Sequence, residues 1–267
     1  MTAPARPLVR RVGLVVPSSN TTMETEVPAL LRRQSLAGGP AYVCHSARLR
    51  LRDVRAEALR AMNEGAGEAA ASLCEAGVDA LMYACLVAAM VDGRASMAST
   101  RERLLAATAA TASVPSGTPA LVTSADALIA ALGALGARSI AMITPYREEL
   151  AASVAATMAE HGIDARRTVA LQVTDNLAVG RLSQEDLLAR ACRLDLRGCD
   201  ALVVSACVQM PSLDVVEEAE RRLGLPVLSA ATASVWQLLA SLGETPRIPG
   251  AGSLLRSGLR AAQRVAA

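Results

Sequence analysis

The chain of 267 residues contains no lysine and no phenylalanine, and only 1% of it is aromatic. All 27 cationic side chains are therefore arginine, and with 25 acidic residues they leave a net charge of +2. No block of basic residues stands out, so the sequence argues against nucleic acid as a partner. Because 52% of the residues are hydrophobic and so few are aromatic, aliphatic side chains must fill the interior, which suits parallel strands buried on both faces.

The sequence also lacks the segments that direct a protein into or across a membrane. Met1–Arg11 contains arginine and proline but no apolar core of the length that a signal peptide needs. The uncharged stretch Gly224–Gly243 is long enough to cross a bilayer, but its proline and polar side chains indicate a short strand and a buried helix instead. We therefore expect a cytoplasmic protein with no membrane partner, whose six cysteines are thiols and not disulfides.

Several common catalytic motifs are missing as well. Val12–Val16 has the character of a central strand, but no glycine-rich phosphate loop follows it, and no Gly-x-Ser-x-Gly elbow occurs anywhere. The chain has no Cys-x-x-Cys pair, and its only histidines, His45 and His161, form no Cys/His cluster with metal-ligand spacing. These absences argue against nucleotide-binding, hydrolase and zinc functions, and we expect no metal site.

Two similar apolar runs, each ending in a cysteine, organise the rest of the chain. Gly77–Leu86 reads Gly-Val-Asp-Ala-Leu-Met-Tyr-Ala-Cys-Leu, and Gly198–Val208 reads Gly-Cys-Asp-Ala-Leu-Val-Val-Ser-Ala-Cys-Val. Ligands of α/β proteins lie at the carboxyl ends of buried strands. The pattern therefore predicts that Cys85 and Cys207 lie at the rims of two sheets, which would face each other across one two-thiol site.

The order of the predicted elements repeats too. Ser139–Tyr146 matches the first strand, so that Pro145 corresponds to Pro17 and Tyr146 to Ser18. Each copy continues with a second strand, a helix and the strand that ends in a cysteine. Repetition of a whole βαβα order indicates an α/β protein with two lobes.

We expect residues 1–123 to form the first lobe and residues 124–230 the second. The resemblance described below implies that a C-terminal segment of about 231–267 returns to the first lobe. Within the lobes, the pattern predicts one long helix over Val54–Glu75 and a strand near Val169–Val173.

The two matched cysteines are the main catalytic candidates. A thiolate is a strong nucleophile and a thiol can act as an acid, so paired thiols across a cleft can exchange roles. Because Cys85 and Cys207 each precede a turn into a helix, we expect exposed N–H groups and the helix dipole to favour the thiolate and make both thiols reactive. The alternative is that both are small core residues, which is the usual role of a buried cysteine. Their matched positions favour the catalytic role.

Polar turns after three other strands supply candidate binding groups. Pro17–Thr22 reads Pro-Ser-Ser-Asn-Thr-Thr and precedes a helix with early acidic residues, an arrangement whose free N–H groups can hold an anion. Ser18 and Asn20 are the candidates there, although a simple helix-capping role explains such a turn equally well. Tyr146 and Asn176 lie at strand tips of the second copy and could stabilise an oxyanion, or be ordinary turn residues.

Five segments of the chain together resemble a known family. They are Val-Pro-Ser-Ser-Asn-Thr-Thr-Met-Glu at 16–24, Tyr-Ala-Cys at 83–85, Thr-Pro-Tyr at 144–146, Asp-Asn at 175–176 and Ser-Ala-Cys-Val-Gln at 205–209. This set resembles the maleate cis-trans isomerases of the aspartate/glutamate racemase superfamily, which also includes the arylmalonate decarboxylases. The resemblance runs from Val12 to about Leu242.

The resemblance implies two pseudosymmetric flavodoxin-like lobes with parallel sheets and an active site in the cleft between them. It implies no cofactor, and a small dicarboxylate as substrate; we also expect a homo-oligomer. Two cysteines are assigned to catalysis and seven residues to substrate binding. The catalytic residues are Cys85 and Cys207, and the binding residues are Ser18, Asn20, Leu86, Val87, Tyr146, Asn176 and Val208.

The residues that follow the cysteines separate this chain from its relatives. The racemases usually have Asn-Thr after the first cysteine and Thr-His after the second, whereas this chain has Leu86-Val87 and Val208-Gln209, which argues against an amino-acid substrate. Arylmalonate decarboxylases keep only the second cysteine, so Cys85 argues against that branch. The resemblance therefore implies isomerisation of maleate through a succinyl-cysteine adduct. A related cofactor-free decarboxylase, racemase or isomerase and a non-catalytic dicarboxylate-binding protein are the alternatives.

Overall fold

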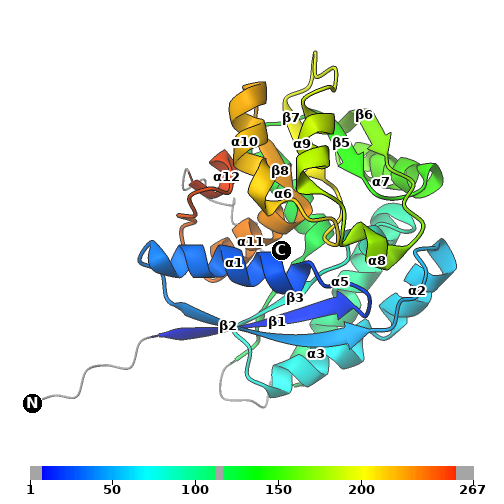
Figure 1. The fold of residues 1–267 in the computed structure, drawn as a ribbon. Helices are drawn as coiled ribbons and strands as arrows, with labels where there is room; N and C mark the ends of the chain where they lie inside the picture. Colours follow the sequence, from blue (N-terminus) through cyan, green and yellow to red (C-terminus); the bar gives the residue numbers. More distant parts are fainter. Residues whose placement is uncertain (1–7, 112–116, 257–267) are drawn as a thin grey trace, which may run out of the picture.

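The computed structural model describes residues 8–111 and 117–256, which form two parallel sheets with helices between the strands (Figure 1). The first half of the chain contains β1 (Val9–Pro17), α1 (Met23–Leu36), β2 (Ala41–Leu49), α2 (Ala56–Glu64), α3 (Ala66–Glu75), β3 (Ala80–Tyr83), α4 (Leu86–Ala89), α5 (Gly93–Ala110), β4 (Ala120–Thr123) and α6 (Ser124–Ala134). The second half contains β5 (Ser139–Thr144), α7 (Glu148–Glu160), β6 (Asp164–Ala170), α8 (Asn176–Val179), α9 (Gln184–Ala191), β7 (Ala201–Ser205), α10 (Leu213–Leu223), β8 (Val227–Ser229), α11 (Ala230–Ser241) and α12 (Ser253–Arg256).

Both sheets have the same topology, which confirms the predicted α/β fold with two related lobes. The strand orders are β2-β1-β3-β4 and β6-β5-β7-β8, and every pair is parallel. This is the start of the flavodoxin-like strand order. The order reverses at the first strand, with the second strand on one side of it and the third on the other, and this leaves a crevice at the carboxyl ends of the first and third strands. In each lobe the cysteine strand pairs with the first strand, so the polar turn and the cysteine reach the same edge of the sheet.

The repeated Gly-x-Asp-Ala-Leu motif has a structural explanation in both lobes. Gly77 and Gly198 have φ values of 65° and 73°, a left-handed conformation that suits glycine. Gly77 follows the end of α3, and Gly198 lies in the turn before β7. The aspartates two residues later each accept backbone hydrogen bonds from the start of the neighbouring strand. Asp79 Oδ2 accepts from Arg11 N at 2.7 Å, and Asp200 Oδ2 accepts from Ser139 N at 2.8 Å. The motif therefore sets the register of each cysteine strand against the first strand of its lobe.

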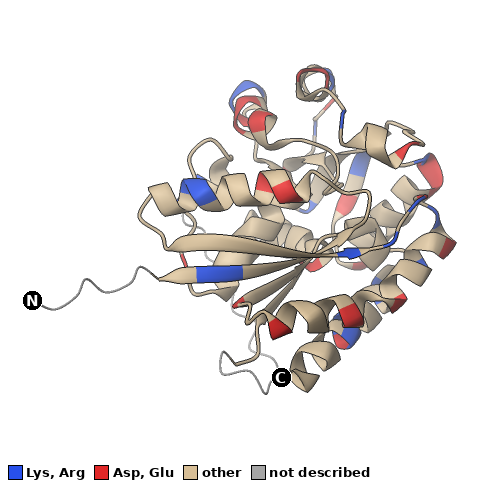
Figure 2. Ribbon diagram, turned by 60° about the horizontal axis from the view of Figure 1, so that its bottom comes forward, with Lys and Arg blue, Asp and Glu red and all other residues tan. Residues whose placement is uncertain are grey.

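The central strands of both sheets are buried, while charge lies on the outside. Every residue of β3 and of β7 is buried, as expected for strands covered by helices on both faces. In the first lobe α3 packs against β1 and β2 on one face, and α1 and α11 pack against the sheet on the other. Arginine and acidic residues are interspersed and lie mainly on helices at the periphery (Figure 2). No described helix is long and apolar enough to cross a membrane, and all six cysteines are free.

The two lobes are joined by helix packing and by a buried carboxylate. Helix α11 follows β8 of the second sheet but packs against α6 and against β4 and α1 of the first. Glu26 of α1 is 6% exposed, and its Oε1 accepts hydrogen bonds from Ser212 N at 2.6 Å and Leu213 N at 2.8 Å at the start of α10. Burial raises the pKa of Glu26, and these two hydrogen bonds oppose that rise. The lobe boundaries at residues 123 and 230 stay a prediction, and residues 257–267 of the C-terminal segment lie outside the described residues.

Two predicted elements differ from the structure. The helix predicted over Val54–Glu75 is divided into α2 and α3 at Gly65, where a Cβ atom would lie 3.3 Å from Leu49 Cδ2. Glycine has a low helix propensity, and the close approach of β2 favours it at this bend. The predicted strand near Val169–Val173 is wrong in position, because β6 spans Asp164–Ala170 and the chain leaves it before Gln172, which has a φ of 56°. Strand β6 lies at the edge of its sheet and carries exposed charges, so its apolar pattern is weak.

Candidate functional site

The two matched cysteines line one cavity between the lobes. Cys85 follows β3 and precedes the single turn of α4, and Cys207 follows β7. Each side chain is 6% exposed. A thiolate at Cys207 would raise the pKa of Cys85, so the two sulfur atoms lie close enough to interact. We call this space the two-thiol cavity.

The two-thiol cavity contains eight of the nine residues predicted for the site. Its volume is about 20 Å³, little more than one water molecule needs. Entry of a dicarboxylate therefore requires the walls to move apart. The cavity is lined by Pro17, Asn20, Leu51, Val54, Cys85, Leu86, Val87, Tyr146, Asn176, Cys207, Val208 and Gln209.

The thiols are buried and protonated, contrary to the expectation of exposed thiols with lowered pKa values. Burial raises the pKa of Cys85 from 9.0 to about 12 and also raises the pKa of Cys207. The rise at Cys85 corresponds to roughly 4 kcal/mol at about 1.4 kcal/mol per pH unit. A helix terminus contributes only about 0.3–1 kcal/mol, and α4 is a single turn. Desolvation therefore outweighs the helix dipole, and the expected lowering of both pKa values is wrong.

The raised pKa of Cys85 predicts how the resting protein reacts with iodoacetamide. Only the thiolate reacts, and well below the pKa its fraction grows about tenfold per pH unit. We expect the exposed Cys192 to be alkylated first. The alkylation rate of Cys85 should be low and should rise about tenfold per unit between roughly pH 7 and 10. Peptide mass spectrometry measures both rates, and a Cys85 rate that is already level near neutral pH would contradict the protonated thiol.

Tyr146 places a hydroxyl group beside both sulfur atoms. It follows β5, is 6% exposed, and its hydroxyl lies 3.4 Å from the backbone oxygen of Ala206, to which it donates. Burial raises the pKa of Tyr146, and a thiolate at Cys207 or at Cys85 would raise it further. A hydrogen bond from Tyr146 acts in the opposite sense on Cys207, whose pKa it lowers against the effect of burial. Tyr146 is therefore a neutral donor that can stabilise negative charge on sulfur.

Asn20 supplies a free amide donor in the cavity. Its Oδ1 accepts hydrogen bonds from Thr22 N at 3.0 Å and Met23 N at 3.1 Å, which orients the side chain at the start of α1. Asn20 is 1% exposed, yet no acceptor among the described residues reaches its Nδ2. An unsatisfied buried amide N–H is costly unless a ligand supplies the acceptor. This donor therefore points to a carboxylate or another oxygen ligand in the two-thiol cavity.

Asn176 lies opposite, at the first residue of α8. Its Nδ2 donates to Ser19 Oγ, so the second lobe contacts the polar turn of the first directly. Its backbone oxygen accepts a hydrogen bond from Gln209 Nε2 at 3.0 Å. Both asparagines are thus held at the junction between the lobes, on either side of the cavity.

Ser18 is the one predicted binding residue that does not line the cavity. Its hydroxyl accepts a hydrogen bond from Leu51 N at 3.0 Å and donates to Leu51 O at 3.3 Å. It fixes the loop that follows β2, and that loop brings Leu51 and Val54 to the cavity wall. Neither of these two apolar residues carries a motif that identifies it from sequence. Gln209 was also missed, although it lies in the Ser-Ala-Cys-Val-Gln segment.

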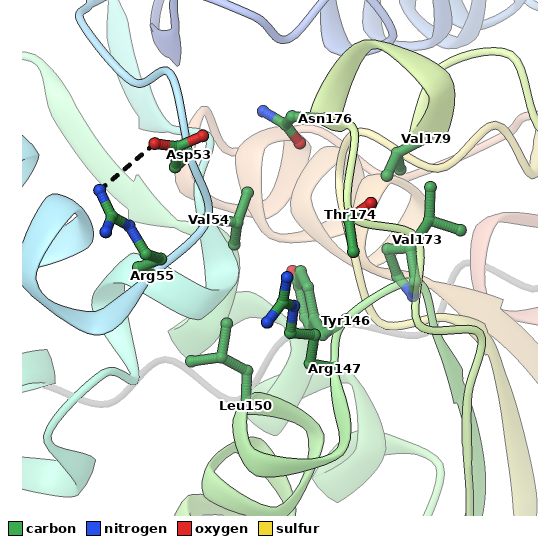
Figure 3. A pocket seen from close by; sticks show the side chains of 11 residues that line it. Asp53, Val54, Arg55, Tyr146, Arg147, Leu150, Val173, Thr174, Asn176 and Val179 are labelled. Carbon is green, nitrogen blue, oxygen red and sulfur yellow. Dashed lines mark hydrogen bonds and ion pairs between the residues drawn. The ribbon is translucent and has the colours of Figure 1, made fainter.

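A second cavity, whose lining side chains are drawn in Figure 3, has a volume of about 240 Å³. We call it the vestibule; it shares Val54, Tyr146 and Asn176 with the two-thiol cavity. The vestibule is lined by Asp53, Val54, Arg55, Pro145, Tyr146, Arg147, Leu150, Val173, Thr174, Asn176 and Val179. Its two arginines outnumber its one aspartate, so the approach to the thiols carries a positive charge that favours an anionic ligand. Within the described residues, no cluster of three or more His, Cys, Asp or Glu side chains could hold a metal ion.

A protein-family model and several known proteins match this chain over most of its length. The model of the arylmalonate decarboxylase family matches residues 12–255. The maleate isomerase of Nocardia farcinica is 45% identical over 249 residues, which are 93% of this chain and 96% of that protein. The maleate isomerase of Geobacillus stearothermophilus is 42% identical over 246 residues, which are 92% of this chain and 96% of that protein.

Solved structures of maleate isomerases superpose closely on this one. The maleate isomerase Iso from Pseudomonas putida S16 superposes with a TM-score of 0.90 at 39% identity, covering 94% of this chain and all of that one. A mutant of the Nocardia farcinica maleate cis-trans isomerase, with a covalently bound succinylcysteine intermediate, has a TM-score of 0.86 at 43% identity and covers 94% of this chain and 99% of that one. Because the family model and these relatives extend over nearly the whole sequence, the chain belongs to the protein family that contains the arylmalonate decarboxylases and the maleate isomerases.

Proposed function

We propose that this protein isomerises maleate to fumarate without a cofactor, through a succinyl adduct on Cys85, with Cys207 as the second catalytic thiol. The observation that carries the proposal is the meeting of two thiols, one from each lobe, in a cavity that also holds the free amide donor of Asn20. The succinylcysteine intermediate of the Nocardia farcinica relative supports the covalent route. The isomerase activity of four relatives at 40–45% identity supports the substrate.

Substrate binding uses the donors at the carboxyl ends of strands in both lobes. Maleate carries two carboxylates, and Asn20 Nδ2 is available for one of them. Asn176, Tyr146 and the backbone N–H groups that follow the two cysteines are the donors for the remaining oxygen atoms. Charge-assisted hydrogen bonds of this kind are about twice as strong as neutral ones. These residue roles are part of the proposal.

The covalent step turns the double bond into a single bond. The Cys85 thiol first gives its proton to solvent, and the thiolate then forms a bond to one alkene carbon. The electron pair of the C=C double bond moves toward the adjacent carboxylate as an enediolate, which is stabilised by the donors or protonated by Cys207. Rotation about the new single bond follows. Return of the electron pair, with loss of the added proton where one was added, expels the Cys85 thiolate and releases fumarate.

Apolar walls support this chemistry. Leu86, Val87 and Val208 are each less than 5% exposed and flank the thiols. They keep water away from the adduct, and in a dry site the donors act more strongly on the developing charge. They also offer no polar partner for an amino group, in agreement with a substrate that lacks one.

The proposal is tested by turnover of the purified protein. Loss of maleate is followed by its ultraviolet absorbance, and fumarate is identified as the product by proton NMR. Citraconate, aspartate and phenylmalonate serve as parallel substrates, and release of carbon dioxide from phenylmalonate identifies a decarboxylase. Tight binding of maleate without conversion would replace the proposal with a dicarboxylate-binding protein.

The expected assembly and location remain predictions within the same proposal. We expect a homo-oligomer in the cytoplasm. Size-exclusion chromatography with light scattering measures the subunit number of the purified protein, and fractionation of the source cells gives the location.

A further inference from the structure

The side chain of Gln209 is buried and fully hydrogen-bonded between the lobes. It is 4% exposed. Its Oε1 accepts from Thr21 N at 3.0 Å, and its Nε2 donates to Ser19 O at 2.9 Å and to Asn176 O at 3.0 Å. One carboxamide therefore connects the turn between β1 and α1 with the start of α8. Only a group with one acceptor and two donors in a fixed plane fits these three partners.

The backbone of Gln209 makes two further contacts at the same place. Its N–H donates to Cys207 Sγ at 3.4 Å, a contact that lowers the pKa of Cys207 against the effect of burial. Its carbonyl oxygen accepts from Thr22 Oγ1 at 2.6 Å. The turn that carries Cys207 is thereby fixed to the first lobe through the same residue.

Each partner of Gln209 adjoins a group of the proposed site. Ser19 and Thr21 flank Asn20, the asparagine with the free amide donor, and Asn176 is itself a lining residue. A shift of Gln209 would therefore move both asparagines and Cys207 together. Misplacement of reacting groups by about 1 Å can reduce a rate by about a hundredfold.

We propose that Gln209 is a positioning residue that sets the distance between the two substrate-binding asparagines and orients Cys207; this inference rests on the proposed function. It occupies the place where the racemases usually have a histidine, but a carboxamide does not titrate. Gln209 therefore acts through the groups that it holds and transfers no proton itself.

The Gln209→Glu variant tests this role through its pH dependence. A protonated carboxyl group can still accept from Thr21 N and donate to one carbonyl oxygen, whereas a carboxylate faces the oxygens of Ser19 and Asn176 with no proton to donate. We expect kcat/KM for maleate to fall about a hundredfold at pH values where the carboxylate prevails. The ratio of variant to wild-type kcat/KM should rise as the pH is lowered, which a loss of stability alone does not produce at temperatures where the variant is folded.

Gln34→Glu is the matched control. Gln34 is also 4% exposed, and its side chain also connects separate segments, donating to Thr245 O at 2.9 Å and accepting from Arg247 N at 2.7 Å. It lies outside both cavities. We expect this variant to lose stability but to keep kcat/KM within about threefold of wild type, with an unchanged pH profile, since neither of these two hydrogen-bond partners lines the two-thiol cavity or the vestibule.

The outcomes separate this inference from the proposed function. The positioning role would be overturned if kcat/KM of Gln209→Glu stayed within threefold of wild type at every pH. It would also be overturned if Gln209→Glu and Gln34→Glu differed only in stability. If the wild-type protein itself does not convert maleate, the proposed function fails, and the alkylation rate of Cys207 by iodoacetamide then decides about Gln209. A rate that changes in Gln209→Glu but not in Gln34→Glu supports the positioning role, and equal rates contradict it.

Discussion

The Cys85→Ala variant is expected to retain less than about a thousandth of the wild-type kcat for maleate, because loss of a covalent nucleophile removes the reaction path itself. In the absence of a thiol on β3, the double bond has no partner with which to form a single-bonded adduct. The remaining donors can still bind the dicarboxylate, so binding of maleate should persist. Loss of ultraviolet absorbance measures turnover, and isothermal titration calorimetry measures binding.

Cys74→Ala is the control for this experiment. Cys74 is 5% exposed, almost the same as Cys85, but it lies on α3 and does not line the two-thiol cavity. The substitution removes one buried sulfur atom in both variants, so a general effect on packing should appear in both. Unchanged turnover in Cys85→Ala, or equal losses in the two variants, would exclude Cys85 as the nucleophile.

The Cys207→Ser variant is expected to lose about a hundredfold to ten-thousandfold in kcat, the usual range for a general acid or base, and to accumulate the succinyl adduct on Cys85. A serine hydroxyl keeps the size of the thiol but exchanges a proton much less readily. The adduct on Cys85 can then still form, but it breaks down only slowly. Intact-protein mass spectrometry after addition of maleate should show a gain equal to one maleic acid, and peptide mapping should place it on Cys85.

The double variant Cys85→Ala with Cys207→Ser provides the reference, since neither thiol of the cavity remains and no adduct is expected. An adduct found on Cys207 in a Cys85→Ser protein, with none on Cys85 in Cys207→Ser, would exchange the roles of the two cysteines.

Local patterns in the sequence predicted the parts of the fold that depend on neighbouring residues. The apolar runs before Cys85 and Cys207 are buried strands because their residues face helices on both sides, and the glycine and aspartate before them fix the turn and the register. The division of a predicted helix at Gly65 depends instead on a tertiary contact with Leu49, at the end of the preceding strand β2. Strand β6 was misplaced because an edge strand with exposed charges lacks the apolar pattern of a central one.

The same distinction applies to the site. Strand-end positions brought Asn20, Tyr146 and both cysteines into one cavity, as the sequence predicted. The role of Ser18 depends on its contact with Leu51, and that of Gln209 on partners as far away as Thr21, and neither contact leaves a pattern in the sequence. The protonation of the thiols also followed from burial in the folded state, which the short helix after Cys85 does not offset.

Ser18 and Tyr146 occupy matched positions in the two lobes but are different residues. This difference matters because the two ends of maleate are equivalent. Maleate presents the same face to either lobe, so a perfectly duplicated pocket would let either sulfur attack. In one lobe the Ser18 hydroxyl is hydrogen-bonded to Leu51, and in the other a hydrogen bond from Tyr146 lowers the pKa of Cys207 against the effect of burial. A single aromatic side chain thus makes the surroundings of the two thiols unequal, and in the proposed mechanism this inequality separates the nucleophile from the acid.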